Sequence, residues 1–220
     1  MELTIPFDQG RTAFTDSVEG FVAAAESFED YELLGASRCH GWTRLDVVTH
    51  VVAGWHEMLG GMVSVVASTP TVDAASYWPA FADQNGAHDP VSVLMEQRRR
   101  TAVYARPSSA LQELRDVAAA IRRGSAAMRD QAVSWQSHVF SSGDFLAVWA
   151  VEDVVHQLDL QGDHPAPEKA VRLTVATIEA LIGRSLPADW GQEQSVLIGT
   201  GREPVPQDAL DLSAVLPAFS

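Results

Sequence analysis

Apolar residues recur at helical spacing along most of the chain, and the clearest case is the segment from Ser142 to Gly162. Its apolar stripe consists of Phe145, Val148, Trp149, Val155 and Leu158. Ser142 or Asp144 can cap the start of a helix, and Gly162 followed by Pro165 can end it. The pattern therefore predicts a single helix over the whole segment.

A second helix is expected to begin at Thr43, because Asp46 stands three residues further on and completes a capping box. The apolar positions continue to Ser68 and cover the helix nearly all round, which is typical of an interior helix. His50 lies within this apolar surface. A single histidine in such a position is most often a core residue with a satisfied hydrogen bond, so alone it indicates no function.

Two more long helices follow from the same periodicity. One covers Arg11 to Tyr31, and the other follows Pro107 with Ser108 or Ser109 as its cap. Four long helices with short or packed connections predict an all-α antiparallel four-helix bundle. Between them, residues 69–89 and 135–142 are interpreted as irregular connections, and a short helix is expected from Asp89-Pro90 to about residue 104.

The composition changes after Gly162, where His164, Pro165 and Pro167 suggest a linker. A further helix is expected over residues 167–183, a short strand at 196–198 and a tight turn at 199–202. We therefore expect two units: the bundle at 1–163 and a small helix-plus-strand appendage at 164–220.

Candidate chemistry lies within the apolar stripe of the Ser142–Gly162 segment. Glu152 and His156 are four residues apart, so both project from one helix face. A pair with this spacing often marks only a polar helix face. Here it stands among apolar residues, and a buried carboxylate is costly unless it has a partner. With His50 the two residues form a set of two nitrogens and one carboxylate, which is typical of catalytic zinc. Iron or nickel would accept the same ligands.

Other polar residues stand near this set in the sequence. Asp159 lies one turn after His156, and Asp46 one turn before His50, so either can orient an imidazole. Cys39 is a candidate nucleophile, although nothing in the sequence lowers the pKa of its thiol. The run Arg98–Arg100 is either a solvated face or an anion-binding group.

The composition limits the kinds of molecule that this protein is expected to bind. The chain has 220 residues, 29 acidic against 15 basic side chains and a net charge of −14, which argues against nucleic acid and anionic membranes. The lone cysteine excludes an intrachain disulfide, and neither a signal peptide nor a membrane span is recognisable. We expect a cytoplasmic protein, a monomer or a homodimer, that acts on a small molecule.

Two stretches resemble a known family. Residues 41–51, GWTRLDVVTHV, resemble the GWTxxDxxxHL signature of the mycothiol-dependent maleylpyruvate isomerase group, and residues 149–160 resemble its ExxxHxxDL helix. This group belongs to the DinB-like metal-binding four-helix bundles. The resemblance implies that His50, Glu152 and His156 bind a metal, usually zinc. The stretch 199–202 is also similar to the C-terminal part of many members, and Arg202 there is expected to contact an anionic substrate or thiol.

The resemblance implies a zinc enzyme that activates a low-molecular-weight thiol such as mycothiol. The thiol would serve in S-transfer to, or cis-trans isomerisation of, a small electrophilic metabolite. Two alternatives remain open. One is a thiol-independent hydrolase or lyase in which the metal activates water, and the other is a non-catalytic binding module stabilised by its metal. Full-length isomerases are expected to carry a larger C-terminal domain than this chain.

Overall fold

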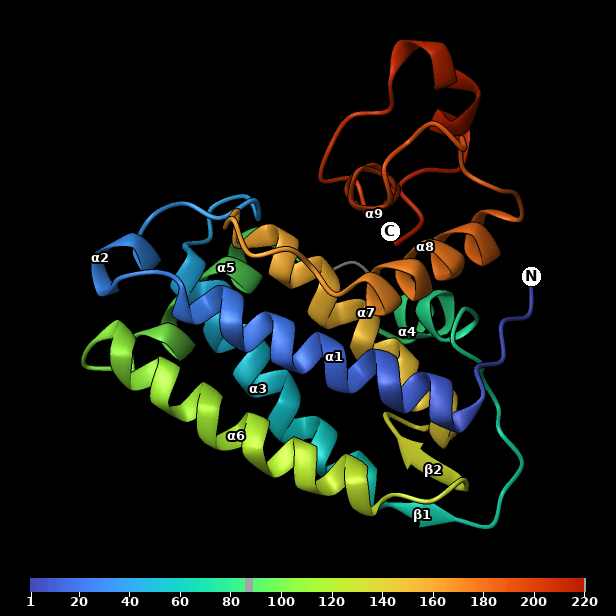
Figure 1. The fold of residues 1–220 in the computed structure, drawn as a ribbon, viewed down its shortest axis with the longest axis horizontal. Coiled ribbons are helices and arrows are strands. Elements are labelled where there is room, and N and C mark those ends of the chain that lie inside the picture. Colours follow the sequence, from blue (N-terminus) through green and yellow to red (C-terminus); the bar gives the residue numbers. More distant parts are fainter. Residues whose placement is uncertain (86–88, 220) are drawn as a thin grey trace.

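The computed structural model describes residues 1–85 and 89–219. Four long helices form the body of the molecule: α1 (Phe7–Glu26), α3 (Arg44–Val63), α6 (Pro107–Ala127) and α7 (Ser142–Asp159). α1 lies along α7, and α3 lies along α6 (Figure 1). The four helices enclose one large apolar core. The predicted all-α bundle is therefore confirmed.

Local sequence signals explain where these helices begin. Thr43 caps α3 as predicted, since its hydroxyl oxygen accepts from the Asp46 N–H while the Asp46 carboxylate accepts from the Thr43 N–H. Ser141 caps α7, so the predicted caps Ser142 and Asp144 are wrong, the first by one residue. At α6 the expected serine caps are wrong, because Pro107 is itself the first helical residue and Arg106 precedes it.

Two predicted connections contain regular structure. Residues 135–142 were expected to be irregular, but β2 (Ala132–Trp135) and β3 (His138–Ser141) form an antiparallel hairpin there. α3 ends at Val63 rather than residue 68, because β1 (Val65–Val66) leaves the helix to pair with β2. These strands are two to four residues long. Stretches so short carry too few positions to show a period of two.

Shorter helices complete the connections. α2 (Asp30–Leu33) is separate from α1, which ends before the predicted boundary. α4 (Tyr77–Asn85) lies within the segment expected to be irregular, and α5 (Pro90–Thr101) begins at the predicted Asp89 cap. The part of the expected irregular segment at 86–88 lies outside the described residues.

The C-terminal part consists of α8 (Glu168–Ile182), α9 (Gln192–Gly199) and a 3-10 helix, η1 (Gln207–Ala214). The strand predicted at 196–198 is wrong, because those residues lie in α9, which packs against α8. A three-residue apolar run cannot distinguish a strand from a buried helical turn.

α8 contributes Val171 to the main core and Ile178 to a second, smaller apolar cluster with α9 and η1. In Figure 1 this C-terminal part stands beside α7 rather than inside the bundle. The division into units at 1–163 and 164–220 stays a prediction, since α8 contributes to both clusters.

The approach of α1 to α7 depends on glycine. A Cβ atom on Gly10 would collide with the backbone of Gly143, and one on Gly143 would collide with the carbonyl oxygen of Ile5. The absence of side chains at this crossing lets α7 lie deep in the bundle, where nearly all of its residues are buried. α7 is thus the central helix of the fold.

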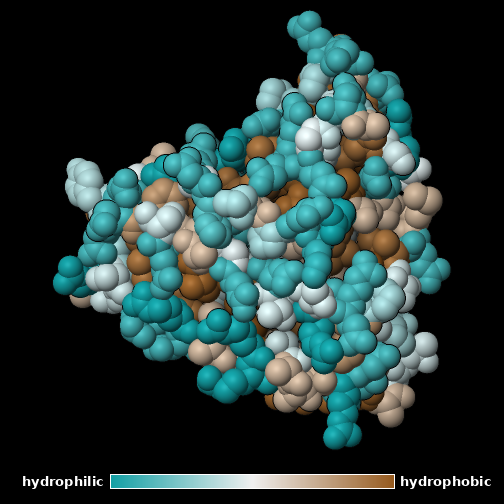
Figure 2. Space-filling view, viewed as in Figure 1, coloured by the Kyte–Doolittle hydropathy of each residue, from teal (hydrophilic) through white to brown (hydrophobic). Residues whose placement is uncertain are grey.

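On the face shown in Figure 2 hydrophilic residues cover most of the surface, and hydrophobic residues are visible in scattered patches. None of the helices in the described part is both long and apolar enough to cross a membrane.

Candidate metal centre

The three residues proposed as ligands meet in the bundle. His50 comes from α3, and Glu152 and His156 come from adjacent turns of α7. One potential ligand atom from each lies within 4.8 Å of the other two. The Nε2 atom of His156 is 3.2 Å from Oε2 of Glu152, and the two imidazole rings are 4.8 Å apart between centroids. Two imidazole nitrogens and one carboxylate match the ligands of a catalytic zinc site.

His156 is held from its far side by Asp159. The Nδ1 atom of His156 lies 3.1 Å from Oδ2 of Asp159, which is fully buried. Arg202 in turn donates to both oxygens of Asp159, at 3.2 and 3.1 Å. Asp159 therefore has the orienting position that the sequence suggested, and Nε2 of His156 is left for the ligand set.

Asp46 does not have the corresponding role at His50. Its buried carboxylate accepts hydrogen bonds from the backbone and hydroxyl of Thr43 and from the Thr101 hydroxyl. The expectation that Asp46 orients His50 is therefore wrong. The one-turn spacing of Asp46 and His50 in the sequence does not show that the Asp46 oxygens are used by the cap at Thr43 and by Thr101 of α5.

The charges around the site favour a cation. Burial and the nearby charge of His156 lower the pKa of His50 to about 3, so its ring is neutral. Burial opposes protonation of His156, but hydrogen bonds to Asp159, Cys39 and Glu152 outweigh it and raise the His156 pKa. Burial would raise the pKa of Glu152, yet the contact with His156 lowers it. The raised His156 pKa and the lowered Glu152 pKa both indicate that positive charge beside the Glu152 carboxylate is favourable.

Cys39 belongs to a second group of possible ligands. Its Sγ atom lies 3.1 Å from Oδ2 of Asp159, and with His156 the three residues offer ligand atoms within 4.8 Å of one another. Asp159 is fully buried and already paired with Arg202, so this group has no free carboxylate to offer an ion. The set with Glu152 is the better candidate, because 37% of the Glu152 side chain is exposed.

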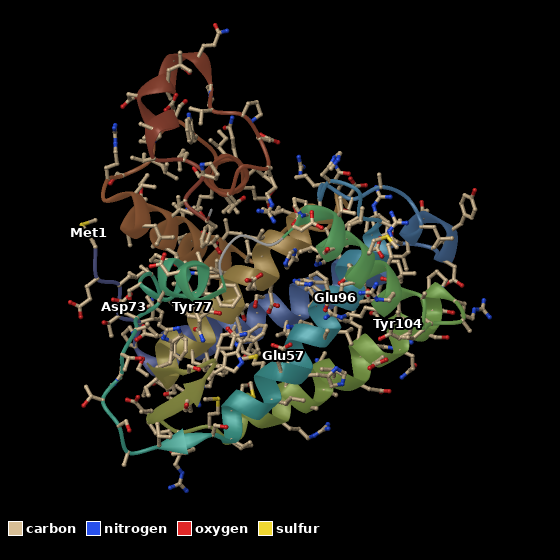
Figure 3. All side chains as sticks on the ribbon, turned by 180° about the vertical axis from the view of Figure 1, so that it is seen from behind. Met1, Glu57, Asp73, Tyr77, Glu96 and Tyr104 are labelled. Carbon is tan, nitrogen blue, oxygen red and sulfur yellow. The ribbon has the colours of Figure 1, made fainter. Side chains whose placement is uncertain are left out.

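The set lies in a pocket of about 180 Å³. Aromatic side chains form its walls: Trp55, Tyr77, Phe81, Trp135 and Trp149. Gln136, at the tip of the β2–β3 hairpin, accepts a hydrogen bond from the Tyr77 hydroxyl at 2.9 Å. Figure 3 shows Tyr77 of α4, Glu57 of α3 and Glu96 of α5 on the side of the molecule turned to the viewer.

Sequence reasoning missed most of these wall residues. Tyr77, Phe81 and Trp135 lie in segments that were expected to be irregular, and only the folded chain brings them to α7. The spacing of Tyr77 and Phe81, one helical turn apart, was the available signal.

Arg202 lies next to the site rather than in the metal pocket. With Glu152, Trp78 and Phe219 it lines a smaller pocket of about 110 Å³. The guanidinium is committed to Asp159, and 25% of the side chain is exposed. The expected contact of Arg202 with an anionic ligand stays a prediction.

The fold and the site together define a helical bundle with a candidate metal-binding pocket at its central helix. A family model described as the mycothiol maleylpyruvate isomerase N-terminal domain matches residues 14–161. The chain belongs to this family. The match includes His50, Glu152 and His156 and bears out the expectation of an enzyme.

Solved structures agree with this fold. A crystal structure of the mycothiol-dependent maleylpyruvate isomerase matches with a TM-score of 0.63 and 13% identity, over 91% of this chain and 92% of that chain. A histidine-to-alanine mutant of that enzyme matches with a TM-score of 0.62, 13% identity and the same coverage. The isomerases were expected to carry a larger C-terminal domain than this chain. This solved chain does not, since 92% of it is covered by the match. A search of curated protein sequences found no match.

Proposed function

We propose that this protein is a metal-dependent enzyme that uses a low-molecular-weight thiol, mycothiol or a close relative, as cosubstrate. It would isomerise, or transfer the thiol to, a small electrophilic metabolite of the maleylpyruvate type. The observation that carries the proposal is the meeting of His50, Glu152 and His156 at an aromatic pocket, in a chain of this family.

The protein's own groups have separable tasks. The three ligand residues would hold the ion, and Asp159 with Arg202 would keep the His156 ring in place. The aromatic walls would exclude water and contact an unsaturated acceptor. When bound, zinc would supply a Lewis acid that lowers the pKa of a thiol. Since that thiol comes with the cosubstrate, the lone cysteine of the chain is not required as a nucleophile.

The test measures product formation from maleylpyruvate, with and without mycothiol, in the wild type and two variants. His156→Ala should eliminate turnover, because it removes one of three ligands. Cys39→Ser should keep the activity within about a few-fold, since a serine hydroxyl can keep the hydrogen bonds that the thiol makes with Asp159 and His156. Elemental analysis of each preparation shows whether zinc is present.

The contrary outcomes are distinct. Turnover of a metabolite without any thiol would reject thiol chemistry and favour a metal-activated water. Loss of turnover in Cys39→Ser with zinc still bound would make Cys39 a nucleophile. A wild-type protein that takes up no metal would remove the basis of the whole proposal.

A further inference from the structure

The metal pocket contains one strongly basic side chain. Of the described residues that line it, Arg100 on α5 is the only arginine or lysine. The acidic side chains that line it belong to Glu57, Glu152 and Asp153. Arg100 lines the same pocket as His50, Glu152 and His156. The guanidinium therefore lies where it can reach a molecule bound beside the metal ligands.

A buried polar network holds α5 in this position. Gln97 is 2% exposed, and its amide nitrogen donates to the backbone oxygen of Asp46 at 2.6 Å and to the Thr49 hydroxyl at 2.9 Å. The Thr101 hydroxyl donates to Oδ1 of Asp46 at 2.7 Å. Arg100 stands between these two anchors and donates to Oε1 of Gln97 at 3.3 Å. Its backbone is thus fixed to α3, the helix that carries His50.

The guanidinium has unused binding capacity. It donates to Gln97 and, at 3.4 Å, to the exposed carboxylate of Glu96, which leaves further N–H groups of its fork without a partner among the described residues. Glu57, the other charged residue at the pocket mouth, forms no ion pair with it. An arginine fork that is 37% exposed and incompletely paired is suited to a carboxylate.

We propose that Arg100 binds a carboxylate of the acceptor molecule and gives the metal pocket its preference for anionic acceptors. This inference rests on the proposed function in one respect, namely that the bound molecule is the acceptor of the reaction. The aromatic walls would contact the carbon skeleton, and the carboxylates of Glu57 and Glu152 would repel an anion that lacked this contact. The other arginines of the 98–100 run would not take part: Arg98 binds the Gly41 carbonyl and Asp46, and Arg99 is exposed.

The experiment is isothermal titration calorimetry of the purified protein supplied with one equivalent of zinc. The probes are maleate and its neutral diamide, with no thiol present. Arg100→Gln should weaken maleate binding about 10-fold or more, because a charge-assisted pair is lost, and should leave diamide binding unchanged. Arg100→Lys should lie between the wild type and Arg100→Gln.

Arg99→Gln is the matched control, since it removes the same charge one residue away and should change maleate affinity by less than about 2-fold. Circular dichroism checks that all variants are folded. The inference is overturned if the wild type binds no maleate, if Arg100→Gln binds maleate as the wild type does, or if Arg99→Gln loses as much. Because no turnover is measured, failure of the thiol chemistry would leave this result standing, and the reverse also holds.

Discussion

Glu152 and Asp153 are neighbours on α7, yet their side chains enter two different polar clusters. Asp153 is 1% exposed and accepts hydrogen bonds from the Trp55 indole N–H and the Ser17 hydroxyl, both at 2.8 Å. Its cluster joins α1, α3 and α7 and is closed to solvent. Glu152 faces the two histidines instead, and 37% of its side chain is exposed.

The pKa values of the two carboxyls shift in opposite directions. Burial raises the pKa of Asp153 to about 7, although Ser17 and Trp55 counteract it. The pKa of Glu152 is lowered, because the contact with His156 outweighs its burial. The neutral donors Ser17 and Trp55 satisfy the hydrogen bonds of Asp153 but do not stabilise its charged form enough to offset burial. The imidazole of His156 does stabilise the charged form of Glu152. We therefore expect the closed cluster to serve the fold and the open one to hold the proposed metal.

The largest effect is expected from Glu152→Ala. It should abolish stoichiometric zinc binding, while the free energy of unfolding of the metal-free protein should change by less than about 1 kcal/mol, because the apolar stripes provide most of the burial. Elemental analysis and urea unfolding measure the two quantities. Loss of the helical circular dichroism in this variant would show that the open cluster also holds the fold.

Asp153→Ala should give the converse result. It leaves the Trp55 N–H and the Ser17 hydroxyl without an acceptor, which should cost about 3 kcal/mol of unfolding free energy. Zinc should still bind with one ion per chain. A variant as stable as the wild type, or one that has lost zinc while folded, would contradict the division between the clusters.

Asp159→Asn should have an intermediate effect on the open cluster. The amide keeps the shape but loses the charge that holds His156 and Arg202. Zinc affinity should fall about 10- to 100-fold without loss of the site. Competition with a chelator of known affinity measures this change, and Asp163→Asn, at an exposed position just after α7, is the control.

The last prediction concerns pH and the closed cluster. Because the pKa of Asp153 is raised to about 7 in the folded protein, the folded state binds more protons than the unfolded state above the ordinary aspartate pKa. Its contribution to stability is complete below about pH 4 and is lost as the pH rises to about 7. Urea unfolding of the metal-free wild type between these pH values should show the decline, and Asp153→Asn should lack that component. If the unfolding free energies of both proteins depended on pH in the same way, the decline could not be assigned to Asp153.

The candidate ligands could be predicted because they depend on local rules. The four-residue spacing puts Glu152 and His156 on one face of any helix that includes them. The capping box at Thr43 and Asp46 sets the start of α3 and so the face on which His50 lies. The resemblance of both motifs to one family then made their meeting an expectation.

The walls of the site could not be predicted in this way. Trp135 and Gln136 reach the pocket on a hairpin whose strands are too short to show periodicity, and Tyr77 reaches it on α4. The sequence does not distinguish Arg100 from Arg98 and Arg99. In the structure the hydrogen bonds of Gln97 fix the orientation of α5, and Arg100 is the arginine of the three that lines the pocket. These positions depend on contacts between segments distant in the sequence.

For this protein the sequence alone determined the helical bundle, the cap of α3 and the three candidate metal ligands, because helical periodicity and capping act within a few residues. Only the tertiary structure decided that Asp153 is satisfied by Trp55 and Ser17, that Asp159 rather than Asp46 orients a histidine, and that Arg202 pairs with Asp159. A hydrogen bond or an ion pair depends on distances of a few ångströms, and between distant segments those distances are set by packing.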